Sequence, residues 1–368
     1  MFNFNNFNLE RYPYKNNKLL AISAAEEYLS FFMSALEFDS NSKILILNDN
    51  FGTLSLLFNK FDVTTVSDSY LSSEAIEYLF KKNNLINNNK FIPITEFLKA
   101  NYENYFDIAL IRIPKATEYF LFLTKLASFY TKKDSLIFSA GMTKYTPNNA
   151  RKILLNAIGN TDIGPVKKKA IGFKSINQKF NFLKPELNFK ITESGKLKIV
   201  SAENVFSDGK PDPGTLFLLN NLPNCISGKV ADLGCGSGLI SSFIKFNNPQ
   251  VELYGIDDSY IAIESSKKTF EKNNLIGNFI VEDGLNSFDD NFFHLVVSNP
   301  PFHSENVMCP EAAERHFPIV SKKLNCVGKF ILVGNLGVNY KPSLINYFKN
   351  VEVINKNKSY YIFECDNI

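Results

Sequence analysis

The chain has 368 residues, of which 45% are hydrophobic and 21% charged, and its formal net charge is +3. The length favours two globular domains, and with so small a net charge no global cationic field indicates a nucleic-acid partner. No stretch approaches ~18 uninterrupted apolar residues and residues 1–14 lack a cationic start before an apolar run, so we expect neither a membrane span nor a secretory signal peptide.

The first half alternates strand and helix patterns. Residues 42–58 predict a strand, a turn and a helix start, and residues 61–80 predict a second strand with its helix. Residues 106–120 predict another strand and its loop, and residues 134–142 a further strand. This alternation is typical of a mainly parallel sheet that is covered on both faces.

A basic segment, residues 166–200, follows, and we expect it to connect two domains. Its lysines include Lys167, Lys168, Lys169 and Lys174. Such a charge run is either a solvated face or a strip that contacts phosphates. Phe173 and Phe180 alternate with the lysines, and exposed rings can stack on unpaired bases, so we interpret the segment as a candidate RNA contact.

The second half repeats the plan of the first. Strands, some with a following turn or helix, are predicted in 228–244, 251–274, 277–283, 292–302 and 326–335, with a final antiparallel hairpin in 350–365. Because order and spacing match, we infer a duplicated α/β domain, with domains at 1–165 and 201–368.

The two halves differ in the residues that could carry chemistry. The second half has Asp232, Gly234, Gly236, Gly238 and Asn299-Pro300-Pro301-Phe302 where the first has Ile46, Asn48, Asn50, Gly52 and Arg112-Ile113-Pro114-Lys115, allowing a shift of one residue. We therefore expect the second half to be catalytic and the first to be a degenerate copy kept for binding.

The glycines of "DLGCGSG" follow a strand at alternate positions. Small residues there let the backbone approach a ligand beyond the carboxyl end of the strand. The turn could serve a dinucleotide, S-adenosylmethionine or the turn alone, and its spacing is not the G-x-G-x-x-G of nicotinamide cofactors.

Two acidic residues follow the next two strands. Asp257 can accept hydrogen bonds from both ribose hydroxyls of an adenosine, or it can cap a helix, a role that Asp258 or Ser259 could also fill. Asp283 can accept from an adenine amino group, or it can be an ordinary loop carboxylate.

Asn299-Pro300-Pro301-Phe302 follows a short apolar strand. The Asn299 side-chain oxygen and the Pro300 carbonyl can both accept from one exocyclic amine, which would aim its lone pair at a methyl donor. Phe302 would stack on the base, while Pro301 stiffens the loop. His303 could touch the base or serve only a local hydrogen bond. The five cysteines form no CxxC pair and no ligand set has metal spacing, so we expect reduced thiols, a cytoplasmic protein and no metal.

At these residues the chain resembles class I S-adenosylmethionine-dependent methyltransferases. "SNPPFHSE" is similar to the ribosomal RNA guanine-N2 methyltransferases, in which two tandem Rossmann-like domains are fused and only the second is active. "LERYP", "LILNDNFGTLS", "SDSYLS" and "NVFSDGKPDPG" resemble the large-subunit branch, the ribosomal RNA large subunit methyltransferase G family. The fold implied is two mainly parallel seven-stranded sheets, each ending in an antiparallel hairpin.

The resemblance implies S-adenosylmethionine as cofactor and a guanine of large-subunit (23S) ribosomal RNA, protein-free or partly assembled, as substrate of a monomeric enzyme. It assigns cofactor roles to Gly234, Gly236, Gly238, Asp257 and Asp283 and catalytic roles to Asn299, Pro300, Pro301 and Phe302. We also expect Asp232, which precedes the glycine turn, to belong to the cofactor-binding residues. It places Asp212 near the cofactor mouth, where Pro213 departs from the aliphatic residue of the family. Small-subunit (16S) RNA methylation, protein glutamine methylation and an inactive RNA-binding assembly factor remain alternatives.

Overall fold

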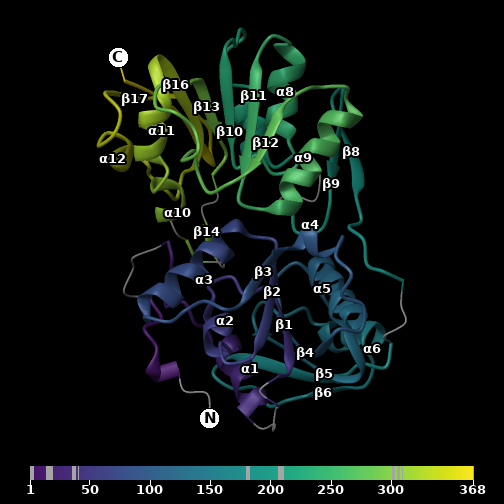
Figure 1. Ribbon diagram of the computed structural model, residues 1–368. Coiled ribbons are helices and arrows are strands. Elements are labelled where there is room, and N and C mark those ends of the chain that lie inside the picture. The colour runs from purple at the N-terminus through teal and green to yellow at the C-terminus, as the bar shows by residue number, and fades with distance from the viewer. Residues whose placement is uncertain are drawn as a thin grey trace. The chain divides into compact units, whose positions relative to one another are not determined.

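The structure is a computed structural model, which divides into two compact units, Met1–Asn188 and Phe189–Ile368 (Figure 1). It describes residues 4–13, 20–34, 39, 41–179, 183–205, 211–300, 303–304, 307–308 and 310–367, with only the backbone at 303–304 and 307–308.

The first unit is built on one seven-stranded sheet. Its strands are β1 (Lys43–Leu47), β2 (Asp62–Ser67), β3 (Lys90–Pro93), β4 (Phe106–Arg112), β5 (Thr131–Met142), β6 (Thr161–Ile163) and β7 (Ala170–Ile176). Its helices are η1 (Phe4–Asn6), α1 (Ala24–Ser34), α2 (Thr53–Leu57), α3 (Tyr70–Lys82), α4 (Ile94–Phe97), α5 (Thr117–Tyr130) and α6 (Ala150–Ala157). The order is β3-β2-β1-β4-β5-β7-β6, parallel from β3 to β5, with β7 antiparallel to β5 and β6.

The second unit repeats this topology as β12-β11-β10-β13-β16-β18-β17. Its strands are β8 (Lys190–Ser194), β9 (Leu197–Ser201), β10 (Lys229–Leu233), β11 (Glu252–Asp257), β12 (Asn278–Val281), β13 (Phe293–Ser298), β14 (His303–Ser304), β15 (Val307–Met308), β16 (Leu324–Asn335), β17 (Asn350–Lys356) and β18 (Tyr360–Asp366). Its helices are α7 (Pro213–Leu219), α8 (Leu239–Asn247), α9 (Tyr260–Lys272), α10 (Glu311–Glu314), α11 (Phe317–Lys323) and α12 (Lys341–Leu344). β8–β9 and β14–β15 form separate hairpins.

The predicted fold class, two mainly parallel seven-stranded sheets with antiparallel last strands, is confirmed. Sheet register also fixes which residues correspond. Leu47 pairs with Ile111 in the first unit as Leu233 pairs with Ser298 in the second, so Arg112 and Asn299 follow equivalent positions.

The connecting segment predicted at 166–200 is where the structure differs from the sequence interpretation. β7 lies within that segment, yet it pairs with β5 and β6 inside the first sheet, and the division between the units falls after Asn188. The sequence did not indicate this strand, because three lysines precede it and Lys174 and Ser175 interrupt its apolar residues.

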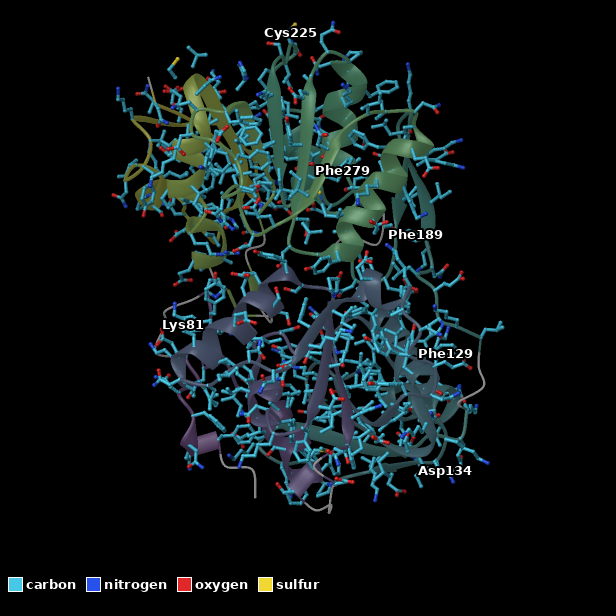
Figure 2. All side chains as sticks on the ribbon, in the orientation of Figure 1. Lys81, Phe129, Asp134, Phe189, Cys225 and Phe279 are labelled. Atoms are coloured by element: carbon cyan, nitrogen blue, oxygen red, sulfur yellow. The ribbon has the colours of Figure 1, made fainter. Side chains whose placement is uncertain are left out.

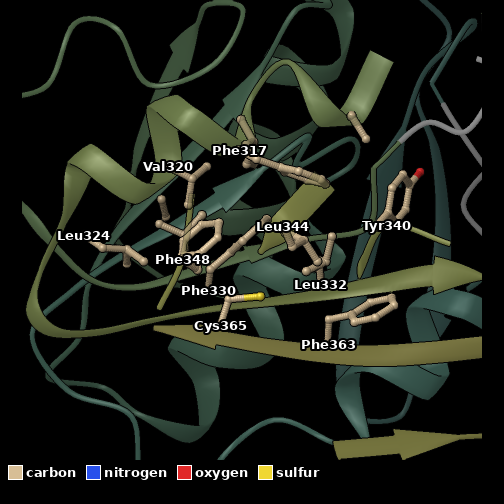
Figure 3. Close-up of a cluster of buried hydrophobic side chains, with 14 of the residues drawn as sticks. Phe317, Val320, Leu324, Phe330, Leu332, Tyr340, Leu344, Phe348, Phe363 and Cys365 are labelled. Carbon is tan, nitrogen blue, oxygen red and sulfur yellow. The ribbon is translucent and has the colours of Figure 1, made fainter. Parts of the chain in front are cut away.

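Both faces of the second sheet are buried. Alternate residues of one strand enter different clusters: Val296 and Phe330 belong to the cluster shown in Figure 3, whereas Val297 and Ile331 belong to the opposite one. Successive side chains of a strand point to opposite faces, so apolar runs such as "LVV" require helices on both sides. This packing holds the carboxyl ends of β10, β11 and β13 in fixed relation.

The described cysteines are free thiols. Cys225, labelled in Figure 2, and Cys326 are exposed, and Cys235 and Cys365 are buried. Within the described residues, no helix combines the length and apolar character needed to cross a membrane, and no three His, Cys, Asp or Glu side chains gather as metal ligands.

Candidate active site

The turn between β10 and α8 carries three glycines with left-handed backbones. φ is 79° at Gly234, 56° at Gly236 and 79° at Gly238. A Cβ added at Gly234 or Gly236 would meet no described heavy atom within 4 Å, so a ligand has room to approach this backbone. A Cβ added at Gly238 would lie 2.9 Å from Oγ and 3.2 Å from Cα of Ser266, so this glycine permits close packing against α9.

Asp232 is fully buried near the end of β10. Its Oδ2 accepts hydrogen bonds from the backbone N (2.9 Å) and Oγ (2.6 Å) of Ser241 in the first turn of α8. Its Oδ1 has no partner among the described residues. Burial raises the pKa of Asp232 to about 7, against the lowering effect of the Ser241 bonds. These contacts attach α8 to the sheet, and direct contact of Asp232 with a cofactor stays a prediction.

Asp257 ends β11 beside the glycine turn. Its Oδ2 accepts from the backbone N of Gly236 (2.8 Å), and its Oδ1 accepts from that of Ser259 (2.9 Å). Ser259 is itself the N-cap of α9, through a bond from Ala262 N to its Oγ. Burial raises the pKa of Asp257. Ser259 therefore fills the helix-capping role that the sequence also allowed for Asp257, whereas Asp257 is hydrogen-bonded to the backbone of the glycine turn.

Asp283 is engaged by two side chains that the sequence did not indicate. Arg315 binds both carboxylate oxygens through NH1 and NH2, and His316 Nε2 lies 3.1 Å from Oδ1. Burial alone would raise the pKa of Asp283, but the bonds from His316 and Arg315 outweigh it and lower the pKa to about 2. Asp283 is thus an ionised, paired carboxylate, and its contact with an adenine stays a prediction.

Asn299 lies directly beyond β13. Ser298 Oγ donates to the carbonyl of Leu233 (2.7 Å), which ties the end of β13 to the residue before Gly234. The Asn299 Nδ2 donates to Asp212 Oδ2 (3.0 Å) and to Thr215 Oγ1 (2.9 Å) at the start of α7. Asn299 and the glycine turn therefore share the carboxyl edge of the second sheet.

The rest of the predicted catalytic stretch is only partly described. Pro300 is buried, whereas Pro301 and Phe302 lie outside the described residues. His303 begins β14, but its side chain also lies outside them. Their predicted roles remain predictions.

The first unit fills the space that its counterpart leaves open. Asn48 has the position and backbone of Gly234, with φ of 71°, and its Nδ2 donates to the carbonyl of Arg112 (2.9 Å). Arg112 Nε donates to Glu26 Oε1 at 3.2 Å, and both side chains are nearly buried. The guanidinium of Arg11 lies 3.9 Å from the ring centroid of Phe51 within the same turn.

The predicted RNA-contacting lysines are spread over two structural settings. Lys168 and Lys169 form the two-residue turn between Lys167 and Ala170, and both have positive φ, 47° and 62°. Lys168 Nζ lies 2.6 Å from Glu27 Oε2. Lys174 instead lies within β7, opposite Asp162.

The aromatic residues predicted to accompany these lysines need correction. Phe173 is only 3% exposed, so it belongs to the core and cannot stack on a base. Phe180 lies outside the described residues. Among the described residues, Phe31 on α1 offers an exposed ring beside this turn: it is 51% exposed, and Lys167 Nζ lies 3.4 Å from its centroid. Phe31 is more than 100 residues from the lysines in sequence, so proximity along the chain could not reveal it.

Comparison with known proteins covers nearly the whole chain. The RLMG N-terminal domain family matches residues 1–175, and the Methyltransferase small domain family matches residues 196–364. The ribosomal RNA large subunit methyltransferase G of Psychromonas ingrahamii is 33% identical over 97% of this chain and 96% of its own length. The chain belongs to the ribosomal RNA large subunit methyltransferase G family.

Further relatives agree with this membership. The methyltransferase G of Pseudoalteromonas translucida is 29% identical over 98% of this chain and 95% of its own. Among solved structures, the T. thermophilus 16S rRNA N2 G1207 methyltransferase, in complex with AdoMet and guanosine, superposes with a TM-score of 0.79. It is 20% identical and covers 94% of this chain and 92% of its own, so this likeness supports the tandem fold alone.

Proposed function

We propose that this chain transfers a methyl group from S-adenosylmethionine to the exocyclic N2 of a guanine in large-subunit (23S) ribosomal RNA, in the cytoplasm. The observation that carries the proposal is the juxtaposition, on one sheet edge, of the open glycine turn and an Asn299 amide whose NH2 group is already engaged. Family membership over almost the full length, with relatives named for large-subunit RNA, supports this substrate.

The residues at the turn fit an adenosine-bearing cofactor. Gly234 and Gly236 leave room for a ligand against the backbone, and the Asp257 carboxylate beside them can accept from ribose hydroxyls. S-adenosylmethionine supplies an electrophilic methyl group on a positively charged sulfur. Gly238 and Asp232 act on the same site indirectly, because they hold α9 and α8 in place.

The chain's own contribution to the reaction is positioning. A guanine N2 is a poor nucleophile because its lone pair is delocalised into the ring. Asn299 Oδ1 and the Pro300 carbonyl each accept a hydrogen bond from one of the two N–H groups of this amine. This pair of hydrogen bonds favours a pyramidal nitrogen, whose lone pair is directed at the methyl carbon. Phe302 stacks on the base, and His303 touches the base or its backbone.

RNA is held, in this proposal, by Lys167, Lys168 and Lys169 with the ring of Phe31. Lysines are uncommon at both central positions of a tight turn with positive φ, where Asn-Gly is favoured. Local strain of this kind is often found at functional sites, and it places two lysines in one turn, of which Lys168 is paired with Glu27. Phe31 offers an exposed face for a base. Lys174 contributes less, since it lies within the sheet.

The substrate is protein-free or partly assembled RNA, because the base must leave its stack to reach Asn299. The test is transfer of a labelled methyl group from S-adenosylmethionine to unmodified, protein-free large-subunit RNA. Wild type is expected to transfer one methyl group per RNA, to a guanine N2, and Asn299→Ala is expected to abolish transfer.

Other outcomes identify the alternatives. Transfer to small-subunit RNA alone would support the sibling activity of the T. thermophilus enzyme, whose fold this chain shares. Transfer to a glutamine of a protein would contradict an RNA substrate. RNA binding by wild type without any transfer would favour an assembly factor.

A further inference from the structure

The start of α7 carries a small polar network that has only one consistent arrangement of hydrogens. A carboxylate has no hydrogen to donate, so every bond to Asp212 is one that it accepts. Its Oδ1 accepts from Gly214 N (2.9 Å), and its Oδ2 accepts from Thr215 N (3.1 Å), as expected of an N-cap. Asp212 Oδ2 also accepts from the Thr215 hydroxyl at 2.5 Å.

The Thr215 hydroxyl has a single hydrogen, and Asp212 takes it. Thr215 Oγ1 can therefore only accept from Asn299, 2.9 Å away, so the Asn299 atom that faces it is the amide nitrogen. Asp212 Oδ2 requires the same atom at 3.0 Å. Both hydrogens of the Asn299 amide are thus used, and Oδ1 has no hydrogen-bond partner among the described residues.

An asparagine amide can rotate by half a turn with almost no change in shape, but not with the same chemistry. One orientation presents an acceptor to the substrate and the other presents two donors. An exocyclic amine has hydrogens to donate, so only the acceptor orientation serves the proposed reaction. We infer that Asp212 and Thr215 are positioning residues, which lock the Asn299 amide with its oxygen toward the substrate and so select an amine over a carbonyl. The inference rests on the proposed function.

The first unit supports this inference by its contrast. Arg112 occupies the equivalent position and also contacts the helix before the first strand, through Glu26 of α1. A guanidinium has five donors and no acceptor. The strand-to-helix contact is therefore kept in both units, but of these two side chains Asn299 can offer an acceptor and Arg112 cannot.

The test separates orientation from stability. Thr215→Val removes the hydroxyl while keeping the shape, and Thr215→Ser restores it. Asp212→Ser keeps a good N-cap but removes the carboxylate that Asn299 contacts. Ser69→Ala is the matched control, because Ser69 caps α3 in the first unit through Ser72 N and is remote in sequence from the site.

Thr215→Val and Asp212→Ser are expected to lower kcat by about 10-fold or more, since misorientation of a positioned group has effects of this size. KM for RNA and the Kd for S-adenosylmethionine should change by less than about twofold, and Thr215→Ser should recover most of kcat. Ser69→Ala should lower Tm without changing kcat. Wild-type kcat in Thr215→Val, or a loss in Thr215→Val that only follows Tm, would overturn the inference.

A second measurement does not need activity. In protein labelled with 15N at asparagine, the side-chain NH2 signal missing from Asn299→Ala belongs to Asn299. Its two hydrogens should exchange slowly with water in wild type and faster in Thr215→Val. Equal exchange in both proteins would show that the lock does not exist. A wild type that is protected yet transfers no methyl group would contradict the proposed function instead.

Discussion

The two units place different side chains beyond equivalent strands, a donor-only arginine in the first and an asparagine in the second, while both keep the glycine that allows close helix packing. Gly52 and Gly238 both let the next helix approach closely: an added Cβ would come within 2.7 Å of Ile76 in one unit and 2.9 Å of Ser266 in the other. What differs is the space above the turn, which Asn48 occupies and Gly234 leaves open. Only part of the glycine-rich turn is therefore open to a ligand, because Gly238, like Gly52 in the first unit, is required for close packing of a helix.

Replacing Asn299 by the residue of the first unit should have the largest effect. Asn299→Arg keeps a donor for Asp212 but removes the acceptor, so methyl transfer should fall by about 10³-fold, while the fold remains. Transfer is measured with labelled S-adenosylmethionine, and Arg112→Ala, which changes the other unit, is the control for general damage. Activity within about tenfold of wild type would show that the acceptor is not needed.

Filling the glycine turn should separate its two functions. Gly234→Asn copies Asn48, whose residue type tolerates positive φ, so the Kd for S-adenosylmethionine should rise by about 100-fold with little change in Tm. Gly238→Asn should instead destabilise the protein by about 1–3 kcal/mol, through overpacking against Ser266. Calorimetric titration and thermal unfolding measure the two effects. Gly52→Asn is the matched control, with a comparable loss of stability and unchanged cofactor affinity.

The buried acids should make stability depend on pH in an unusual direction. The folded pKa of Asp232 is about 7 and that of Asp49 about 6, both above the ordinary 3.8 because of burial. Each folded acid keeps a proton that the unfolded chain has lost, so its contribution to the free energy of unfolding falls as pH rises from about 4 to its folded pKa. In urea unfolding, Asp232→Asn should flatten the dependence up to about pH 7, and Asp49→Asn only up to about pH 6. Slopes unchanged by both substitutions would contradict the assignment.

The lysine turn should give the smallest effect and test whether the first unit binds RNA. Replacing Lys168 and Lys169 by Asn and Gly keeps the positive φ values and removes two charges, so RNA affinity should fall and its logarithmic salt slope should decrease by about 1.4. Affinity for S-adenosylmethionine should not change. Lys132→Asn, which removes another exposed, paired lysine of this unit, is the control. An identical salt slope in wild type and the double variant would show that the two lysines do not contact RNA and only form a solvated surface.

Sequence was sufficient for the architecture because buried parallel strands leave apolar runs such as "KILIL" and "LVV", and the turns follow them at equal spacing. The same spacing matched Asp232 with Ile46, and it matched Asn299 with Arg112 with an uncertainty of one residue. The sheet register removes that uncertainty. It also led to Asp257, which lies at the predicted strand end.

Sequence failed where one side chain meets another from a distant element. Thr215 is 84 residues from Asn299 and Arg315 is 32 from Asp283, and neither pair has a local pattern. Phe173 lies in the core, and a phenylalanine beside lysines looks the same in sequence whether its strand is interior or on a surface. For the same reason the sequence does not distinguish β7 from a connecting segment.

In each unit a buried aspartate accepts hydrogen bonds from the first turn of the helix that follows the first sheet strand, but it stands at a different sequence position in the two units. In the first, Asp49 Oδ2 accepts from Ser55 N and Oγ, both at 2.8 Å; in the second, Asp232 does so from Ser241, although Asp232 corresponds to Ile46. A residue-by-residue alignment would record this acid as missing from the first unit, because Ile46 stands in its place. The same hydrogen bonds are made there by Asp49, three positions later. Comparing two copies of a domain therefore requires comparing hydrogen-bonded atoms in space, and by that measure both units keep the same acid-to-serine support of the helix.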